Sequence, residues 1–120
     1  MMNSPESRLR IRKEADVTVV EFLDRHLLDE ANIAQFSEDI GSLVNSETSP
    51  KVLISFANVE HLSSAVLSAL ITIHNRIKTK DGQLRLSDIS DQILEVFHIT
   101  QLDRMFHIHK GADDALESFA

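Results

Sequence analysis

The sequence contains no cysteine, tryptophan or tyrosine, and it has only three glycines and two prolines. The lack of cysteine excludes disulfides, thiolate metal ligands and cysteine nucleophiles. The six phenylalanines offer few platforms on which nucleic-acid bases could stack. Glycine is too scarce for a Gly-rich phosphate-binding loop, and the Gly-x-x-x-x-Gly-Lys-Ser/Thr pattern is absent. The function therefore does not depend on cysteine chemistry or on a Gly-rich phosphate-binding loop, and base stacking is poorly supported.

A surplus of positive charge is also missing, because the chain carries a net charge of −7 at pH 7. A protein that binds the nucleic-acid backbone needs a basic patch, so we expect no nucleic-acid partner. No apolar run approaches the roughly 20 residues that span a bilayer. The N-terminal segment MMNSPESRLR also lacks the apolar stretch of a signal peptide. We expect a cytoplasmic protein without direct membrane insertion.

What the chain does contain is the composition of one folded domain, with 120 residues of which 42% are hydrophobic and 26% charged. Residues 1–7 are polar and include Pro5, so we expect a disordered tail there. We expect one domain over residues 8–119, without a linker or an internal repeat.

Alternating apolar residues predict strands, and apolar residues three or four positions apart predict helices. In chain order these patterns predict strands near residues 9–11 and 17–22 joined by a turn at 13–16, a charged connector at 24–29, a helix over 33–44, a strand at 51–56, a helix at 64–79, a strand at 84–86, a short helix after 90, a turn at 100–104, a strand over 105–108 and a helix at 112–119. The repeated strand–helix–strand order implies right-handed crossovers. The predicted fold class is α/β: a mixed sheet, with an N-terminal antiparallel hairpin followed by parallel strands, and about four helices.

The segment HLSSAVLSAL, residues 61–70, places two serines at the start of the second long helix. Backbone N–H groups at a helix N-terminus have no intrahelical acceptor and lie at the positive end of the helix dipole. A phosphate added to Ser64 or Ser63 would find hydrogen-bond donors there. Serine is also an ordinary N-cap residue. The pattern alone therefore permits both a capping role and a phosphorylation switch.

The segment VLISFANVEHLSSAVLSAL, residues 52–70, resembles part of the STAS domain, the family of bacterial anti-sigma factor antagonists. In that family an apolar strand and a turn lead to an Asp-Ser-Ser/Ala-Gly-Leu segment that opens a long helix. DGQLRLSDIS (residues 81–90) and ILEVFHITQLDRMFHIHKGADDALESF (residues 93–119) are similar to the family's next strand and C-terminal part. The resemblance covers about residues 8–119.

The resemblance implies a protein-binding switch and not an enzyme. In the implied cycle, the unphosphorylated domain binds an anti-sigma factor that is also a serine kinase. The kinase phosphorylates the domain, the complex separates, and a phosphatase resets it. The phosphorylated position corresponds to Ser64, with Ser63 as the alternative. The implied partner-binding surface comprises Asn58, His61, Ser63, Ser64, Ala65, Val66 and Ser68.

The sequence departs from the family pattern at Ser55 and Ser63, where the family has Asp, and at Val66, where it has Gly. Gln101 likewise replaces the Gly of a Thr-Gly-Leu turn. Ser63 can still cap the helix, so we expect the fold to be retained. The loss of two carboxylates favours a second function without phosphorylation. The module would then be a scaffold in a signalling assembly or a regulatory subunit of a membrane transporter.

Three other kinds of site, a metal site, a hydrolase site and a phosphoacceptor site, lack residues that they would need. The His107-x-His109 spacing would place two rings on one face of a strand, but structural zinc sites usually have four ligands. A hydrolase built on Ser64 and His61 lacks an orienting acid and the Gly-x-Ser-x-Gly elbow. A phosphoacceptor receiver domain needs acidic strand ends to hold Mg²⁺, whereas the strand at 51–56 ends in Ser-Phe. We expect no catalytic activity, no metal and no cofactor.

Overall fold

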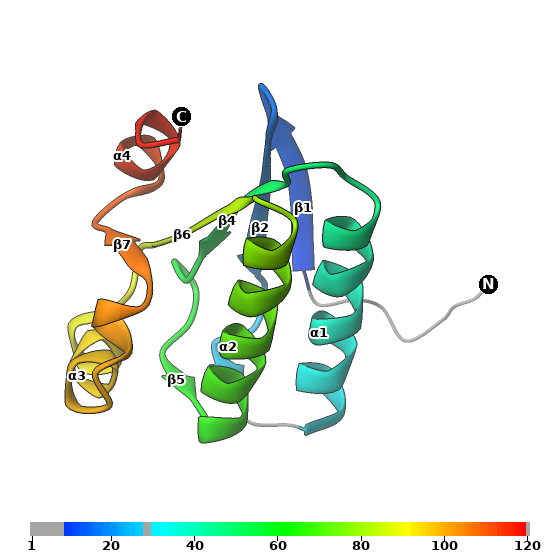
Figure 1. Ribbon diagram of the computed structural model, residues 1–120. Coiled ribbons are helices and arrows are strands. Elements are labelled where there is room, and N and C mark those ends of the chain that lie inside the picture. Colours follow the sequence, from blue (N-terminus) through cyan, green and yellow to red (C-terminus); the bar gives the residue numbers. More distant parts are fainter. Residues whose placement is uncertain (1–8, 28–29, 120) are drawn as a thin grey trace.

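The computed structural model describes residues 9–27 and 30–119 (Figure 1). The tail expected at residues 1–7 lies outside the described residues. The elements, in chain order, are β1 (Leu9–Glu14), β2 (Val17–Phe22), β3 (His26–Leu27), α1 (Glu30–Asn45), β4 (Lys51–Ser55), β5 (His61–Leu62), α2 (Ser64–Thr79), β6 (Gln83–Ser87), α3 (Asp91–Ile99), the 3₁₀ helix η1 (Leu102–Arg104), β7 (His107–His109) and α4 (Ala112–Glu117).

The main sheet has five strands in the order β1-β2-β4-β6-β7. β1 and β2 form an antiparallel hairpin in which Glu14 lies opposite Val17. The remaining neighbours in this sheet are parallel. This arrangement confirms the predicted α/β fold with a mixed sheet and four α-helices.

The helices α1 and α2 cover one face of the main sheet (Figure 1). We call this the two-helix face. Strand residues alternate between the two faces of a sheet, so Val20 and Phe22 of β2 point to the same side. Phe22 meets Phe36 of α1 edge-to-face, with ring centroids 5.0 Å apart. The buried cluster on this face also contains Ile40, Val44, Val52, Ile54, Val66, Leu70, Ile73, Ile77, Leu84 and Leu86.

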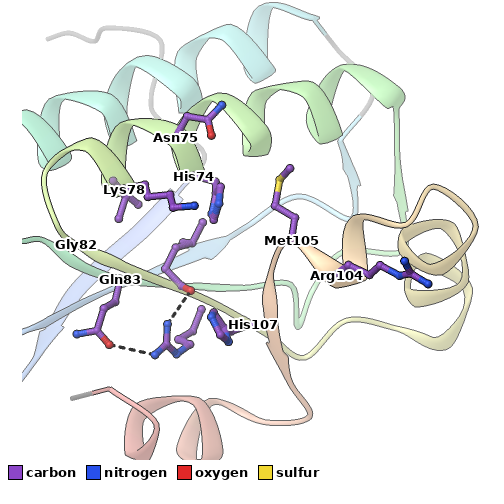
Figure 2. Close-up of a pocket in the computed structure, with 11 residues that line it drawn as sticks. His74, Asn75, Lys78, Gly82, Gln83, Arg104, Met105 and His107 are labelled. Atoms are coloured by element: carbon purple, nitrogen blue, oxygen red, sulfur yellow. Dashed lines mark hydrogen bonds between the residues drawn. The ribbon is translucent and has the colours of Figure 1, made fainter.

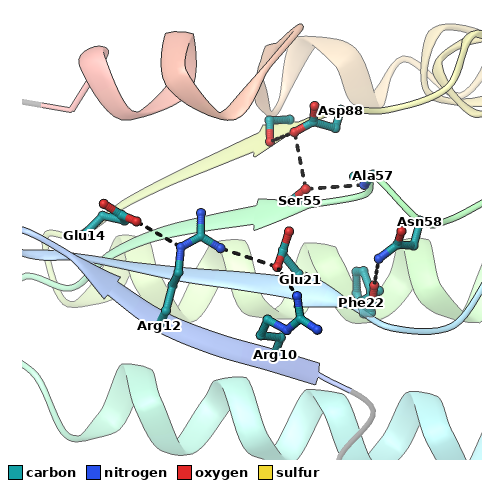
Figure 3. Close-up of polar contacts among 10 residues, drawn as sticks. Arg10, Arg12, Glu14, Glu21, Phe22, Ser55, Ala57, Asn58 and Asp88 are labelled. Carbon is teal, nitrogen blue, oxygen red and sulfur yellow. Dashed lines mark hydrogen bonds and ion pairs between the residues drawn. The ribbon is translucent and has the colours of Figure 1, made fainter.

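The opposite face of the sheet, which we call the α4 face, is covered more thinly. The six-residue helix α4 contributes Ala115 to a small buried cluster with Val17, Val19 and Leu53. Figure 3 shows the polar edge of this face, where arginine and glutamate side chains of β1 and β2 meet. These pairs are Arg12–Glu14 at 3.0 Å, Arg12–Glu21 at 3.4 Å and Arg10–Glu21 at 3.8 Å.

The structure differs from the predicted element list in several places, including the lengths of β1 (Leu9–Glu14) and α1 (Glu30–Asn45). The connector expected at 24–29 contains β3, which pairs in parallel with β5 to form a second, two-stranded sheet. The strand predicted from residue 105 begins at His107, because the amide of Phe106 donates to the carbonyl of Leu102 and ends the η1 turn instead. The last helix ends at Glu117, before Phe119. In the described ranges, no helix is both long and apolar enough to cross a bilayer.

Candidate partner-binding site

The loop between β4 and α2 is fixed to the rest of the protein by backbone hydrogen bonds. The amide of Val59 donates to the carbonyl of Phe56 at 3.0 Å, and both side chains are buried. Farther along, the amides of Glu60 and His61 both donate to the carbonyl of Arg25, at 2.7 and 3.1 Å. The start of α2 is therefore held in place by contacts to a segment 35 residues earlier.

Ser64 is the first residue of α2, and it is exposed. Ser63 occupies the N-cap position with an extended backbone, φ −95° and ψ 167°. Its side chain makes no capping hydrogen bond, and its Oγ is buried without a hydrogen-bond partner in the part of the chain that the structure describes. The structure confirms Ser63 as the N-cap residue, but its hydroxyl accepts no hydrogen bond from the first turn of α2. Among the described residues no side-chain hydrogen bond caps this helix end, and no acidic residue lies in its first turn.

The other residues of the implied surface divide into exposed and buried groups. Asn58, His61 and Ser68 are exposed. Asn58 also donates its side-chain amide to the carbonyl of Phe22 at 3.1 Å, which orients it. Ala65 is half-buried, whereas Val66 is fully buried in the main core. The side chain of Val66 therefore anchors the loop and is not available to a partner.

A carboxylate lies next to Ser55 even though that position is not aspartate. Ser55 and Ser87 end adjacent parallel strands, and both hydroxyls donate to Oδ2 of Asp88, at 3.3 and 2.7 Å (Figure 3). The amide of Ala57 donates in turn to Oγ of Ser55 at 3.3 Å. Asp88 has a left-handed backbone, φ 59°, which turns the chain at this point. Asp88 directly follows β6 in the sequence, but the pairing of β6 with β4 was needed to place its carboxylate beside Ser55.

A cavity of about 560 Å³ lies where the C-terminal half of α2 meets β6 and β7. Its lining includes Arg85 and no carboxylate. Figure 2 shows His74, Lys78 and His107 in the same lining. Burial lowers the pKa of His74, and Lys78 and His107 lower it further. Burial likewise lowers the pKa of His107, together with Arg85 and His109. The positive charge of the lining therefore comes from Lys78, Arg85 and Arg104.

Arg85 is held inside this lining by several contacts. Its Nε donates to Oγ of Ser118 at 2.9 Å, and its guanidinium lies 5.0 Å from the ring centroid of Phe119. A second donation, from Nη2 to Oε1 of Gln83, measures 3.0 Å. Arg85 therefore joins β6 to the end of α4, at the far end of α2 from Ser64.

The comparisons with known proteins agree with one another. A family model of the STAS domain matches residues 9–115. The chain is similar to an anti-sigma-factor antagonist (STAS) domain protein from Planctomyces limnophilus, with 27% identity over 93% of this chain and 97% of that chain, and a TM-score of 0.83. It is also similar to an anti-sigma factor antagonist from Mycobacterium paratuberculosis, with 23% identity over 98% of each chain and a TM-score of 0.81.

A third similarity is to part of a much larger protein. The murine Solute Carrier 26 family member A9 anion transporter matches 88% of this chain, with 16% identity and a TM-score of 0.73. The match covers only 18% of the transporter chain. At this identity, and at that of the Mycobacterium paratuberculosis protein, the likeness concerns the fold alone.

Proposed function

Since the chain belongs to the STAS domain family, we propose that it is an anti-sigma factor antagonist whose binding is controlled by phosphorylation of Ser64. The partner would be an anti-sigma factor that is also a serine kinase, and a phosphatase would reset the cycle. The similarity to the Planctomyces limnophilus antagonist domain supports this function. The role is regulatory and non-enzymatic.

The observation that carries the choice of serine is the difference in accessibility between two neighbours. Ser64 is exposed at the first position of α2, whereas Oγ of Ser63 is buried. A kinase has to reach the hydroxyl that it modifies, so Ser64 is the better acceptor. Ser63 would require the N-terminus of α2 to open first.

Phosphate on Ser64 would change the surface more than the fold. It adds a charge of about −1.5 to −2 at neutral pH. The helix N-terminus tolerates that charge through its dipole and its free N–H groups. Val66 and Leu67, two and three residues after Ser64, stay buried in the core. The added charge and bulk would then act on the partner across the surface formed by Asn58, His61, Ser64 and Ser68.

A second function is favoured by a specific observation. Neither Ser63 nor the end of β4 supplies the aspartate of the family pattern, and a STAS-like part occurs in an anion transporter. The chain would then be a scaffold in a signalling assembly or a regulatory subunit of a transporter, without phosphorylation. Co-purification with a kinase-like ATPase supports the first function, whereas co-purification with a permease supports the second.

The direct test is the affinity of Ser64 variants for the co-purified anti-sigma factor kinase. Ser64→Asp should weaken binding by about tenfold or more, equivalent to about 1.4 kcal/mol. Ser64→Ala should keep wild-type affinity and resist release by ATP. Ser42→Asp is a matched control, because it adds the same charge at an exposed position of α1. Equal affinities for wild type, Ser64→Asp and Ser64→Ala would contradict the proposal.

A further inference from the structure

Two histidines face each other across the small sheet formed by β3 and β5. His26 lies directly opposite His61 in the parallel register. Their Nδ1 atoms are 3.0 Å apart, with ring planes inclined by only 6° and centroids 4.9 Å apart. The two nitrogens are closer than the centroids, so the rings approach through their Nδ1 edges. A hydrogen bond at this distance needs one ring to carry a proton on Nδ1 and the other ring to present its Nδ1 lone pair.

A carboxylate completes this group. One potential ligand atom from each of His26, Glu60 and His61 lies within 4.8 Å of the others, and all three residues are exposed. Arg25 is the charged neighbour of Glu60, with Nε 3.9 Å from Oε2. That distance is long for an ion pair between exposed groups, so Arg25 holds the carboxylate weakly.

The backbone that carries these side chains is fixed on both sides. The carbonyl of Arg25 accepts from the amides of Glu60 and His61, and the carbonyl of Leu27 accepts from the amide of Ser63 at 3.0 Å. Leu27 is also buried in the main core. The histidine pair is therefore placed by the fold and not by chance contact of two long surface side chains.

We propose that His26, His61 and Glu60 form a binding site for a divalent transition-metal ion of the zinc type. Two imidazole ligands on tetrahedral zinc have their nitrogens about 3.3 Å apart, given Zn–N bonds of about 2.0–2.1 Å. The observed 3.0 Å needs only a small opening to reach that separation. The donating ring moves its proton from Nδ1 to Nε2 through solvent, so both rings remain neutral and both Nδ1 lone pairs bind the ion.

The ligand set selects the class of ion. Two imidazoles and one carboxylate suit zinc and its transition-metal neighbours, whereas Mg²⁺ and Ca²⁺ prefer shells of oxygen ligands. Three protein ligands also leave a fourth position of tetrahedral zinc open to water or to a side chain of another protein. The bound ion would tie β3 to β5 next to Ser63 and Ser64. This site does not depend on whether Ser64 is phosphorylated.

The histidine spacing in the sequence points elsewhere, to His107 and His109 on β7. Residues 26 and 61 are far apart in the chain, and only the pairing of two very short strands brings them together. His109 is therefore a useful control for zinc binding by an isolated surface histidine. The three-ligand group in the described part of the chain does not include it.

The test is calorimetric titration of the full chain with Zn²⁺ alone, for wild type and four variants. Wild type should bind a single zinc ion per chain, with a raised melting temperature. His26→Gln and His61→Ala should abolish that binding, and Glu60→Gln should weaken it by about tenfold or more. His109→Ala should bind like wild type, and Mg²⁺ should not compete.

Long-range ¹H–¹⁵N spectra of wild type give a second readout, independent of whether any variant folds. The Nδ1 resonances of His26 and His61 should shift together on addition of zinc. Melting without zinc shows which variants remain folded. Wild-type affinity in His61→Ala and His26→Gln, unshifted Nδ1 resonances, or the absence of a saturable site at micromolar zinc would each overturn the proposal.

Discussion

The two faces of the main sheet are closed in different ways. The two-helix face is covered by α1 and α2, each of 16 residues, and its cluster of buried side chains extends from β2 to β6. The α4 face is covered by a helix of six residues over a cluster of four buried side chains. Toward β1 it continues as a surface of paired arginines and glutamates.

This difference separates the part of the molecule that holds the fold from the part that tolerates change. Burial of apolar area is the dominant stabilising term, and most of it lies on the two-helix face. The exposed Ser64 is attached to that face, because Val66 and Leu67 follow it into the core. A modified serine can therefore alter the surface without releasing the helix that carries it.

The largest expected difference between the faces comes from shortening one leucine on each. Leu70→Ala removes a fully buried side chain on the two-helix face and should lower the free energy of unfolding by about 2–5 kcal/mol. Leu116→Ala removes a half-buried side chain of α4 and should cost about 1 kcal/mol. Urea denaturation of both variants measures the difference, and equal losses would refute the asymmetry between the faces.

Two glycines allow the packing beside α2 to be compared with the packing beside α4. Gly82 lies between α2 and β6, and Gly111 precedes α4. A Cβ added at Gly82 would collide with the carbonyl of Pro50 and lie 2.9 Å from Cγ2 of Ile77. A Cβ at Gly111, the N-cap of α4, would meet nothing within 4 Å. Gly82→Ala should therefore destabilise by about 1–3 kcal/mol, and Gly111→Ala should stay within about 1 kcal/mol of wild type. Thermal melts of the pair test this, and the reverse order would contradict it.

The same contrast explains how much the sequence could predict. The helix at 64–79 was predicted with the bounds that the structure shows, because a long apolar stripe and a clear strand before it define the element. The short helix expected after residue 90 is also present, and its N-cap Ser90 accepts from the amide of Ile93 at 3.3 Å. In a long helix packed on the two-helix face, every turn places apolar residues toward the core, so the sequence pattern predicts the helix reliably.

Contacts between residues that are far apart in the sequence leave no periodic pattern from which they could be predicted. Strands β3 and β5 have two residues each, too short for any periodicity, so the His26–His61 contact appeared only in the structure. The Asp88 carboxylate beside Ser55 required knowledge of which strands are neighbours. The burial of Oγ of Ser63 and the hydrogen bond from its amide to the carbonyl of Leu27 belong to the tertiary structure, which helix propensity does not encode.

A smaller effect is expected for the ion pairs on the α4 face. Glu21 is half-buried and lies between the exposed side chains of Arg12 and Arg10, at 3.4 and 3.8 Å. Glu21→Gln should cost no more than about 1 kcal/mol. The cost should shrink further at high salt, because salt screens exposed charges. Denaturation at low and high salt measures both values. A loss comparable with that of Leu70→Ala would show that charge, and not apolar burial, holds this face.

The smallest effect concerns pH and the histidine between α2 and β7. The pKa of His74 lies below its ordinary value, mainly through burial, so the unfolded chain binds this proton more readily than the folded chain. The contribution of His74 to the free energy of unfolding is therefore fully present above about pH 6.5 and declines as the pH falls below that value. His74→Gln should flatten the fall in unfolding free energy between about pH 7 and about pH 5. An unchanged slope would place the acid sensitivity in other groups.

We propose above all that Ser64, exposed at the first residue of α2, is a phosphorylation switch. The most direct measurement is phosphopeptide mapping of the protein isolated from its native cells, during growth and under stress. The account predicts phosphate on Ser64, with an occupancy that changes between the two conditions. Phosphate absent from Ser64 in every condition would contradict the claim and leave the chain as a constitutive binding module.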